Sequence, residues 1–152
     1  MKTLLGLQQL STRFDDAIND WGGSLLSLAI RFYVGGQFLK AGLTKVSDWS
    51  ATLALFHEEY KVPLLSPDVA AVMGAAGELA LPVLLFVGLL SRPAALALFA
   101  VNVMAVISYP QLFSFDCPAA INDHFYWGAL LLVVAAFGPG RFSLDNILNK
   151  KP

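Results

Sequence analysis

The sequence has little charge and almost no cysteine. Only 14% of its 152 residues are charged and 57% are hydrophobic, against about 25% charged and 45–50% apolar in an average soluble domain. This balance argues against a water-soluble protein of this length. Cys117 is the single cysteine, which excludes an intramolecular disulfide and a cysteine-rich metal or iron–sulfur cluster. A net charge of −1 provides no basic surface for nucleic acid.

The start of the chain also lacks the pattern of a signal peptide. The first twenty residues contain Arg13, Asp15, Asp16 and Asp20 and have no long apolar core. We therefore expect the first spanning helix itself to direct membrane insertion.

Four segments are apolar over enough residues to cross a hydrocarbon core of about 30 Å. They are residues 24–42, 69–90, 93–109 and 119–138. The last segment reaches full length only if it begins near Ala119, which places Asp123 and His124 below the outer surface. The sequence thus predicts an all-α polytopic membrane protein, a four-transmembrane-helix bundle forming one domain over residues 1–152. A soluble all-helical protein is the alternative.

Basic residues near the helix ends predict the orientation, because lysine and arginine gather on the cytoplasmic side. With both termini inside, six basic residues are cytoplasmic and two are external: Lys2, Arg13, Arg92, Arg141, Lys150 and Lys151 against Lys45 and Lys61. Two flanking segments, 4–21 and 49–60, carry apolar residues at helical spacing and are predicted to be short interfacial helices. Ordinary packing helices explain them equally well.

Several ionisable residues interrupt the apolar segments, where each charge costs about 2.5–3.5 kcal/mol at the helix centre. Arg31 and Lys45 stand at the ends of one helical stripe that also contains Gly35, Phe38 and Gly42, and this stripe is predicted to face the interior. The helical rise puts Arg31 about 10 Å from the inner boundary and Glu78 about 14 Å from the outer one. We therefore expect an Arg31–Glu78 ion pair with Asn102 nearby. Glu78 is then a structural partner, a proton carrier, or both.

The loop before the last segment gathers polar residues close to the outer surface. Asp116, Cys117, Asp123 and His124 lie within nine residues, followed by Trp127. Such side chains suit a metal, but their spacing matches no standard zinc or copper site, and no metal site is predicted. Helix capping explains part of the loop. His124 could instead hydrogen-bond a quinone carbonyl or pass a proton.

These residues resemble the signature of the DoxX family over nearly the whole chain. The resemblance rests on the stripe from Arg31 to Lys45, and on Gly74, Gly77 and Glu78 followed by Gly88-Leu89-Leu90-Ser91-Arg92. It implies a multi-pass protein of the bacterial cytoplasmic (inner) membrane linked to redox systems, similar to subunits of thiosulfate:quinone oxidoreductase. Its matching sites are Arg31, Lys45 and Glu78. Asp116-Cys117-Pro118 and the stretch from Asn122 to Gly128, which includes Asp123 and His124, resemble a subgroup encoded beside metal-binding peptides and their modifying enzymes.

Three functions fit these observations. The first is a redox-linked subunit that binds a quinone within the bundle and works with a partner oxidoreductase or a thiol- or metal-stress system, without a metal or haem of its own. In this quinone-binding function, Glu78 and His124 are the catalytic residues. The predicted ligand contacts are Arg31, Lys45, Asn102, Asp123 and Trp127. The second is a non-catalytic anchor or assembly factor for an oxidoreductase or peptide-modifying complex. The third is a small transporter, which would need to form a homodimer to enclose a path. The sequence leaves open whether the chain is an enzyme.

Overall fold

The computed structural model describes residues 12, 14–15, 18–114 and 119–149, and all regular structure in these ranges is helical. A π-helical turn, η1 (Ile18–Gly22), leads directly into α2 (Gly23–Ser47). The remaining elements in chain order are α3 (Trp49–Glu58), α4 (Pro67–Val87), α5 (Ser91–Ser108), the 3₁₀ turn η2 (Pro110–Phe113), α6 (Ala119–Phe137) and α7 (Leu144–Asn149). The all-α prediction is confirmed.

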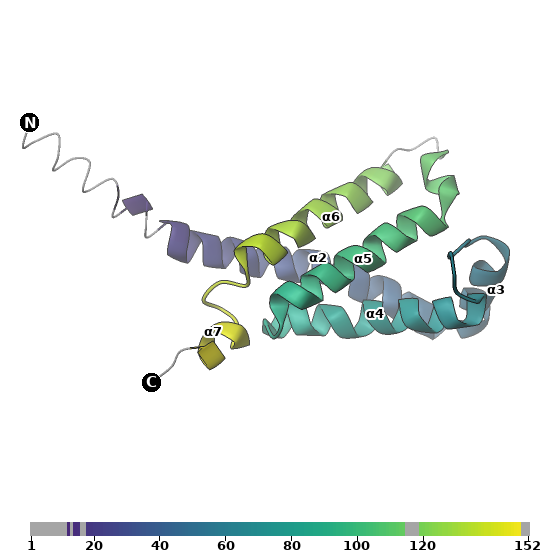
Figure 1. Ribbon diagram of the computed structural model, residues 1–152, viewed down its shortest axis with the longest axis horizontal. Coiled ribbons are helices and arrows are strands. Elements are labelled where there is room, and N and C mark those ends of the chain that lie inside the picture. Colours follow the sequence, from purple (N-terminus) through teal and green to yellow (C-terminus); the bar gives the residue numbers. More distant parts are fainter. Residues whose placement is uncertain (1–11, 13, 16–17, 115–118, 150–152) are drawn as a thin grey trace, which may run out of the picture.

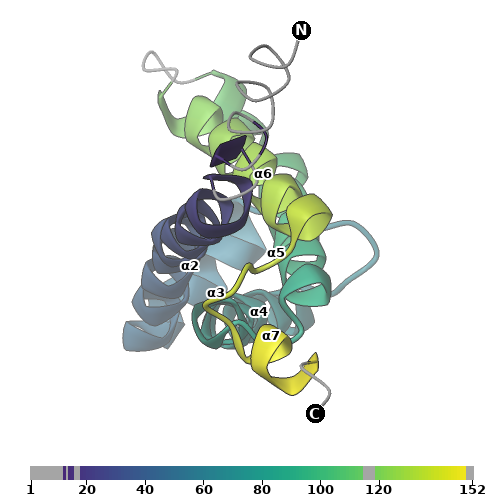
Figure 2. The same cartoon turned by 90° about the vertical axis from the view of Figure 1, so that its left-hand side faces the viewer.

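Four long helices form the body of the molecule (Figures 1 and 2). Helix α4 packs against α2 on one side and α5 on the other, α5 packs against α6, and a thinner contact joins α6 back to α2. Successive helices run in opposite directions, so the α4–α5 turn and α7 lie at one end while α3 and η2 lie at the other. The apolar core between them is built from side chains of all four: Ile30, Val34, Phe38, Leu85, Ala94, Ala95, Leu98, Leu131 and Val134.

Three of the four predicted spanning helices are present with the required length and apolar character. Helices α4, α5 and α6 are each long and apolar enough to cross a membrane, and they match the predicted segments 69–90, 93–109 and 119–138 within a few residues. Helix α2 is longer, at 25 residues. It also carries the charged residues Arg31 and Lys40, and it is not one of the three helices that are apolar enough to cross a membrane. The crossing of the membrane by residues 24–42 stays a prediction.

Residues next to the helix ends explain where α3 begins and where α4 ends. Helix α2 continues beyond the predicted end at Gly42 to Ser47, and Asp48 then caps α3 by accepting a hydrogen bond of 3.0 Å from the amide of Ala51. Helix α4 ends at Gly88, whose φ of 70° is a left-handed conformation that glycine adopts without strain. Helix α3 falls within the predicted segment 49–60, whereas most of the predicted segment 4–21 lies outside the described residues.

Candidate functional site

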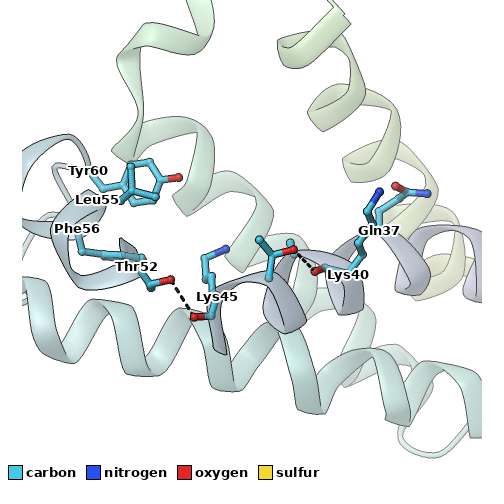
Figure 3. Close-up of a pocket in the computed structure, with 9 residues that line it drawn as sticks. Gln37, Lys40, Lys45, Thr52, Leu55, Phe56 and Tyr60 are labelled. Carbon is cyan, nitrogen blue, oxygen red and sulfur yellow. Dashed lines mark hydrogen bonds between the residues drawn. The ribbon is translucent and has the colours of Figure 1, made fainter. Parts of the chain in front are cut away.

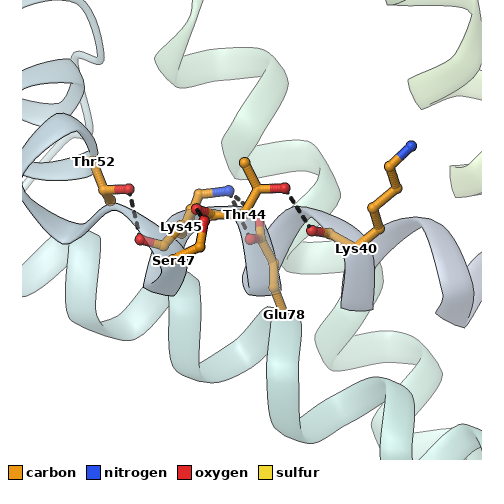
Figure 4. A network of polar contacts seen from close by, with 6 residues as sticks. All are labelled: Lys40, Thr44, Lys45, Ser47, Thr52 and Glu78. Carbon is orange, nitrogen blue, oxygen red and sulfur yellow. Dashed lines mark hydrogen bonds and ion pairs between the residues drawn. The ribbon is translucent and has the colours of Figure 1, made fainter.

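Lys45 and Glu78 form an ion pair between α2 and α4 in the half of the bundle next to α3. The Nζ atom of Lys45 lies 2.6 Å from Oε2 and 2.9 Å from Oε1 of Glu78 (Figure 4). Glu78 is 7% exposed, so its carboxylate is nearly removed from solvent. The three N–H donors of a lysine ammonium exceed the two acceptor atoms used here, which leaves donor capacity for a ligand.

The close approach of α2 and α4 sets this pair. A Cβ atom at Gly42 would lie 3.0 Å from Cβ of Glu78 and 3.1 Å from its backbone carbonyl carbon, so only glycine lets the two backbones meet here. The hydroxyl of Thr52 donates a 2.9 Å hydrogen bond to the carbonyl of Lys45 and fastens α3 to the end of α2. Together these contacts fix the backbone of Lys45 beside Glu78.

An open groove of about 320 Å³ lies beside this ion pair, between α2 and α3 (Figure 3). Its walls are mostly apolar, and the lining residues are Gln37, Lys40, Ala41, Thr44, Lys45, Thr52, Leu55, Phe56 and Tyr60. The ring of Tyr60 packs edge-on against Phe56 and Tyr109, at centroid distances of 4.9 and 5.2 Å. Burial, followed by Tyr109 and then nearby acidic groups, raises the pKa of Tyr60, so its hydroxyl stays protonated and can donate a hydrogen bond.

A second polar cluster joins α5 to α6. Asn102, which is 3% exposed, donates from Nδ2 to the carbonyl of His124 at 2.9 Å, and its Oδ1 lies 2.8 Å from Nδ1 of His124. The His124 ring packs edge-on against Trp127 at 5.0 Å, and Trp127 in turn contacts Phe38 of α2 at 5.8 Å. The structure thus brings together three predicted site residues, Asn102, His124 and Trp127.

The two clusters lie at similar depths in the bundle. A Cβ atom at Gly77 would lie 3.3 Å from Cγ2 of Val101, so α4 and α5 are in contact at these positions. Glu78 and Asn102 follow these two residues, and because α4 and α5 run in opposite directions, the two steps of about 1.5 Å separate them only slightly in depth. Glu78 and Asn102 therefore lie within about one helical turn of each other along the bundle.

The predicted Arg31–Glu78 ion pair is wrong. Arg31 is fully buried, as its place on the interior stripe predicts, but its guanidinium donates to the carbonyls of Leu85 and Phe142, at 2.9 and 2.5 Å. The physical reason is the register of the helices. Glu78 faces Gly42, which lies eleven residues beyond Arg31, or about 16 Å along a helix. Arg31 instead reaches the opposite end of α4.

Asp145 supplies the nearby negative charge at that end, and sequence reasoning did not identify it. Its carboxylate accepts hydrogen bonds from the amides of Leu90 and Ser91, at 2.8 and 2.9 Å, and so caps α5 from α7. Burial opposes ionisation of Asp145, but these hydrogen bonds and the charge of Arg31 outweigh it and lower its pKa. The position just after Ser143 suggests a helix start, yet no local pattern links Asp145 to α5.

The remaining predicted residues are more dispersed. Asp123 is exposed at the start of α6. Asp116 and Cys117 lie outside the described residues. Within the ranges that the structure describes, no group of three histidine, cysteine or acidic side chains could hold a metal ion.

Comparison with known proteins gives one curated relative. An uncharacterized protein of Haemophilus influenzae is 26% identical over 138 residues, covering 85% of this chain and 87% of its own length. No solved structure matches the chain. The family model of DoxX matches residues 26–111, more than half of the sequence, and this range contains Arg31, Lys45, Glu78 and Asn102. With its long apolar helices, the chain is a membrane protein that belongs to the DoxX family.

Proposed function

We propose that this protein is a redox-linked subunit of the bacterial cytoplasmic membrane, with several crossings, that binds a quinone in the groove beside Lys45 and Glu78. The observation that carries the proposal is the ion pair itself. Removing two charges from water costs several kcal/mol per ion before their attraction is counted, and ionisable groups within membrane helices commonly mark functional sites. Here the pair lies directly beside an open, mostly apolar groove.

The groove suits the head group of a quinone in size and chemistry. Ligand pockets span about 300–1,000 Å³, so a groove of about 320 Å³ fits one small ring rather than a large polar substrate. A quinone carbonyl accepts hydrogen bonds, and Lys45 and Tyr60 both line the groove with donors. The apolar walls would pack on the faces of the ring.

Each residue has a distinct role in this proposal. Lys45 donates to a quinone oxygen, and Glu78 holds the ammonium group in place and can exchange the proton that accompanies electron transfer. Tyr60 donates from the α3 side of the groove. Arg31 is left out of the ligand contacts because its fully buried guanidinium is directed to backbone carbonyls at the other end of the bundle. Electrons pass to a partner oxidoreductase or a diffusible carrier.

Binding of a short-tail benzoquinone to the protein in lipid nanodiscs tests the proposal. We expect saturable binding by isothermal titration and retention of the quinone in native mass spectra. Lys45→Met should weaken binding roughly tenfold or more, because a hydrogen bond to a charged group contributes about 1.5–3 kcal/mol. Lys61→Met is the matched control, since Lys61 is exposed and does not line the groove.

Two results would contradict the proposal. One is the absence of saturable quinone binding by folded protein. The other is equal weakening by Lys45→Met and Lys61→Met, which would show that the groove is not the site.

A non-catalytic membrane anchor is the second candidate function. It is favoured by the contacts of Arg31 and Asp145, which join separate elements of the bundle: Arg31 of α2 donates to the carbonyls of Leu85 and Phe142, and Asp145 of α7 accepts from the amide of Ser91. An anchor predicts co-purification of a stable partner complex whose activity is unchanged by Glu78→Gln.

A further inference from the structure

The orientation of the Asn102 side chain is fixed by one atom that can only accept. A backbone carbonyl has no hydrogen to donate, so the group 2.9 Å from the carbonyl oxygen of His124 must be the amide nitrogen of Asn102. The amide oxygen of Asn102 then faces Nδ1 of His124 at 2.8 Å. Two atoms that both lack hydrogen would repel at that distance, so Nδ1 must carry the proton.

A protonated Nδ1 determines the character of the other ring nitrogen. In a neutral imidazole one nitrogen donates and the other accepts, so Nε2 of His124 keeps its lone pair. Among the residues that the structure describes, none bonds Nε2, and the half-buried ring rests against Trp127. Nε2 is therefore a hydrogen-bond acceptor with no bonded partner within residues 18–114 and 119–149.

A glycine in α6, Gly128, makes room for the hydrogen bonds between Asn102 and His124. A Cβ atom at Gly128 would lie 3.2 Å from Nδ2 of Asn102 and 3.3 Å from Cε2 of Phe99. Glycine at this position lets α6 approach α5 closely enough for Asn102 to bond both the ring and the carbonyl of His124. One buried side chain takes part in both hydrogen bonds, donating to the carbonyl and accepting from Nδ1–H, and so holds the imidazole in a single tautomer and orientation.

We infer that Asn102 is a positioning residue that locks His124 in the Nδ1–H form, so that Nε2 receives a hydroxyl group of the ligand. This inference rests on the quinone function proposed above. His124 is not among the residues that line the groove beside Lys45, so the ligand must extend beyond that groove to reach Nε2, and the hydroquinone, which carries O–H donors, is then the form that His124 prefers. The oxidised quinone has only acceptor oxygens and cannot bond Nε2. The inference concerns hydrogen bonding alone and requires no bond to break.

The tautomer can be measured directly, because the chain contains only two histidines. His57→Gln leaves His124 as the single imidazole, and ¹⁵N spectra of histidine-labelled protein in nanodiscs, at a pH where the ring is neutral, distinguish Nδ1–H from Nε2–H. We expect the Nδ1–H form. Asn102→Leu should shift the population toward Nε2–H, whereas Asn102→Asp, which retains an acceptor oxygen, should restore Nδ1–H. An Nε2–H form in the His57→Gln protein would overturn the inference.

The preference for the reduced ligand is tested on the same proteins. A short-tail hydroquinone, kept reduced under anaerobic conditions, should bind the His57→Gln protein several-fold more tightly than the corresponding quinone, the scale of one hydrogen bond. Asn102→Leu should remove this preference, with circular dichroism showing that the helices are intact. Equal affinities for the two forms would overturn the assigned ligand while leaving quinone binding intact. Failure of both forms to bind would overturn the proposed function and the assigned ligand together, and the tautomer spectra would still decide the role of Asn102.

Discussion

Separate and combined substitution of Lys45 and Glu78 should reveal how strongly the buried ion pair is coupled. Breaking a buried pair by removing one partner costs about 3–5 kcal/mol, whereas replacing both partners by apolar groups is often nearly neutral. Lys45→Met, Glu78→Leu and the double variant form the cycle. We expect the two single losses to sum to at least about 2 kcal/mol more than the loss in the double variant.

The structure also predicts that the two single variants differ. The Lys45 side chain is 20% exposed and lines the groove, so without Glu78 its ammonium group can move toward water. The Glu78 side chain is 9% exposed, and its short stem on α4 offers no such route. Lys45→Met should therefore destabilise the protein more than Glu78→Leu, with the Lys45→Met loss near the upper part of the range of about 3–5 kcal/mol.

Reversible unfolding in mixed micelles of a mild detergent and dodecyl sulfate gives the free energies needed for this cycle. Lys61→Met is the control and should change stability by no more than about 0.5 kcal/mol, as expected for an exposed side chain. Additive losses would refute direct pairing. A larger loss for Glu78→Leu than for Lys45→Met would refute the argument from exposure.

Three further predictions follow from the packing and capping contacts. Gly42→Ala should cost about 1–3 kcal/mol in the same unfolding assay, because its Cβ would press on Glu78, whereas Gly36→Ala, which meets nothing within 4 Å, should be neutral or stabilising. Asp145→Ala should cost about 0.5–2 kcal/mol as a lost cap. Because the folded pKa of Asp145 is lowered, this contribution is fully present above the unfolded value of about 3.9, and the stability difference between wild type and variant should shrink as the pH falls from there through the folded pKa. Arg31→Lys should destabilise by at least about 1 kcal/mol, because one ammonium group cannot reproduce a fork that spans two carbonyls, and an unchanged unfolding curve would contradict this.

The inward face of the first helix could be predicted because it depends only on local periodicity. Arg31, Gly35, Phe38 and Gly42 recur at spacings of three and four, and all four are buried. Composition and run length likewise predicted the apolar helices α4, α5 and α6, because a bilayer requires about 20 consecutive apolar residues whatever their neighbours are. These features follow from the order of residues along one segment.

The partners of the charged residues were decided only by the tertiary structure. Which residue meets Glu78 depends on where α2 crosses α4, and the close contact at Gly42 selects Lys45 and sends Arg31 to the far end of the bundle. The cap that Asp145 provides for α5 and the hydrogen bonds between Asn102 and His124 also join segments that are separated in the chain. The sequence determined that polar groups would face inward. Their pairing required the relative depth of the helices, a quantity that no single segment encodes, because it is set by contacts between helices such as the close approach of α2 and α4 at Gly42.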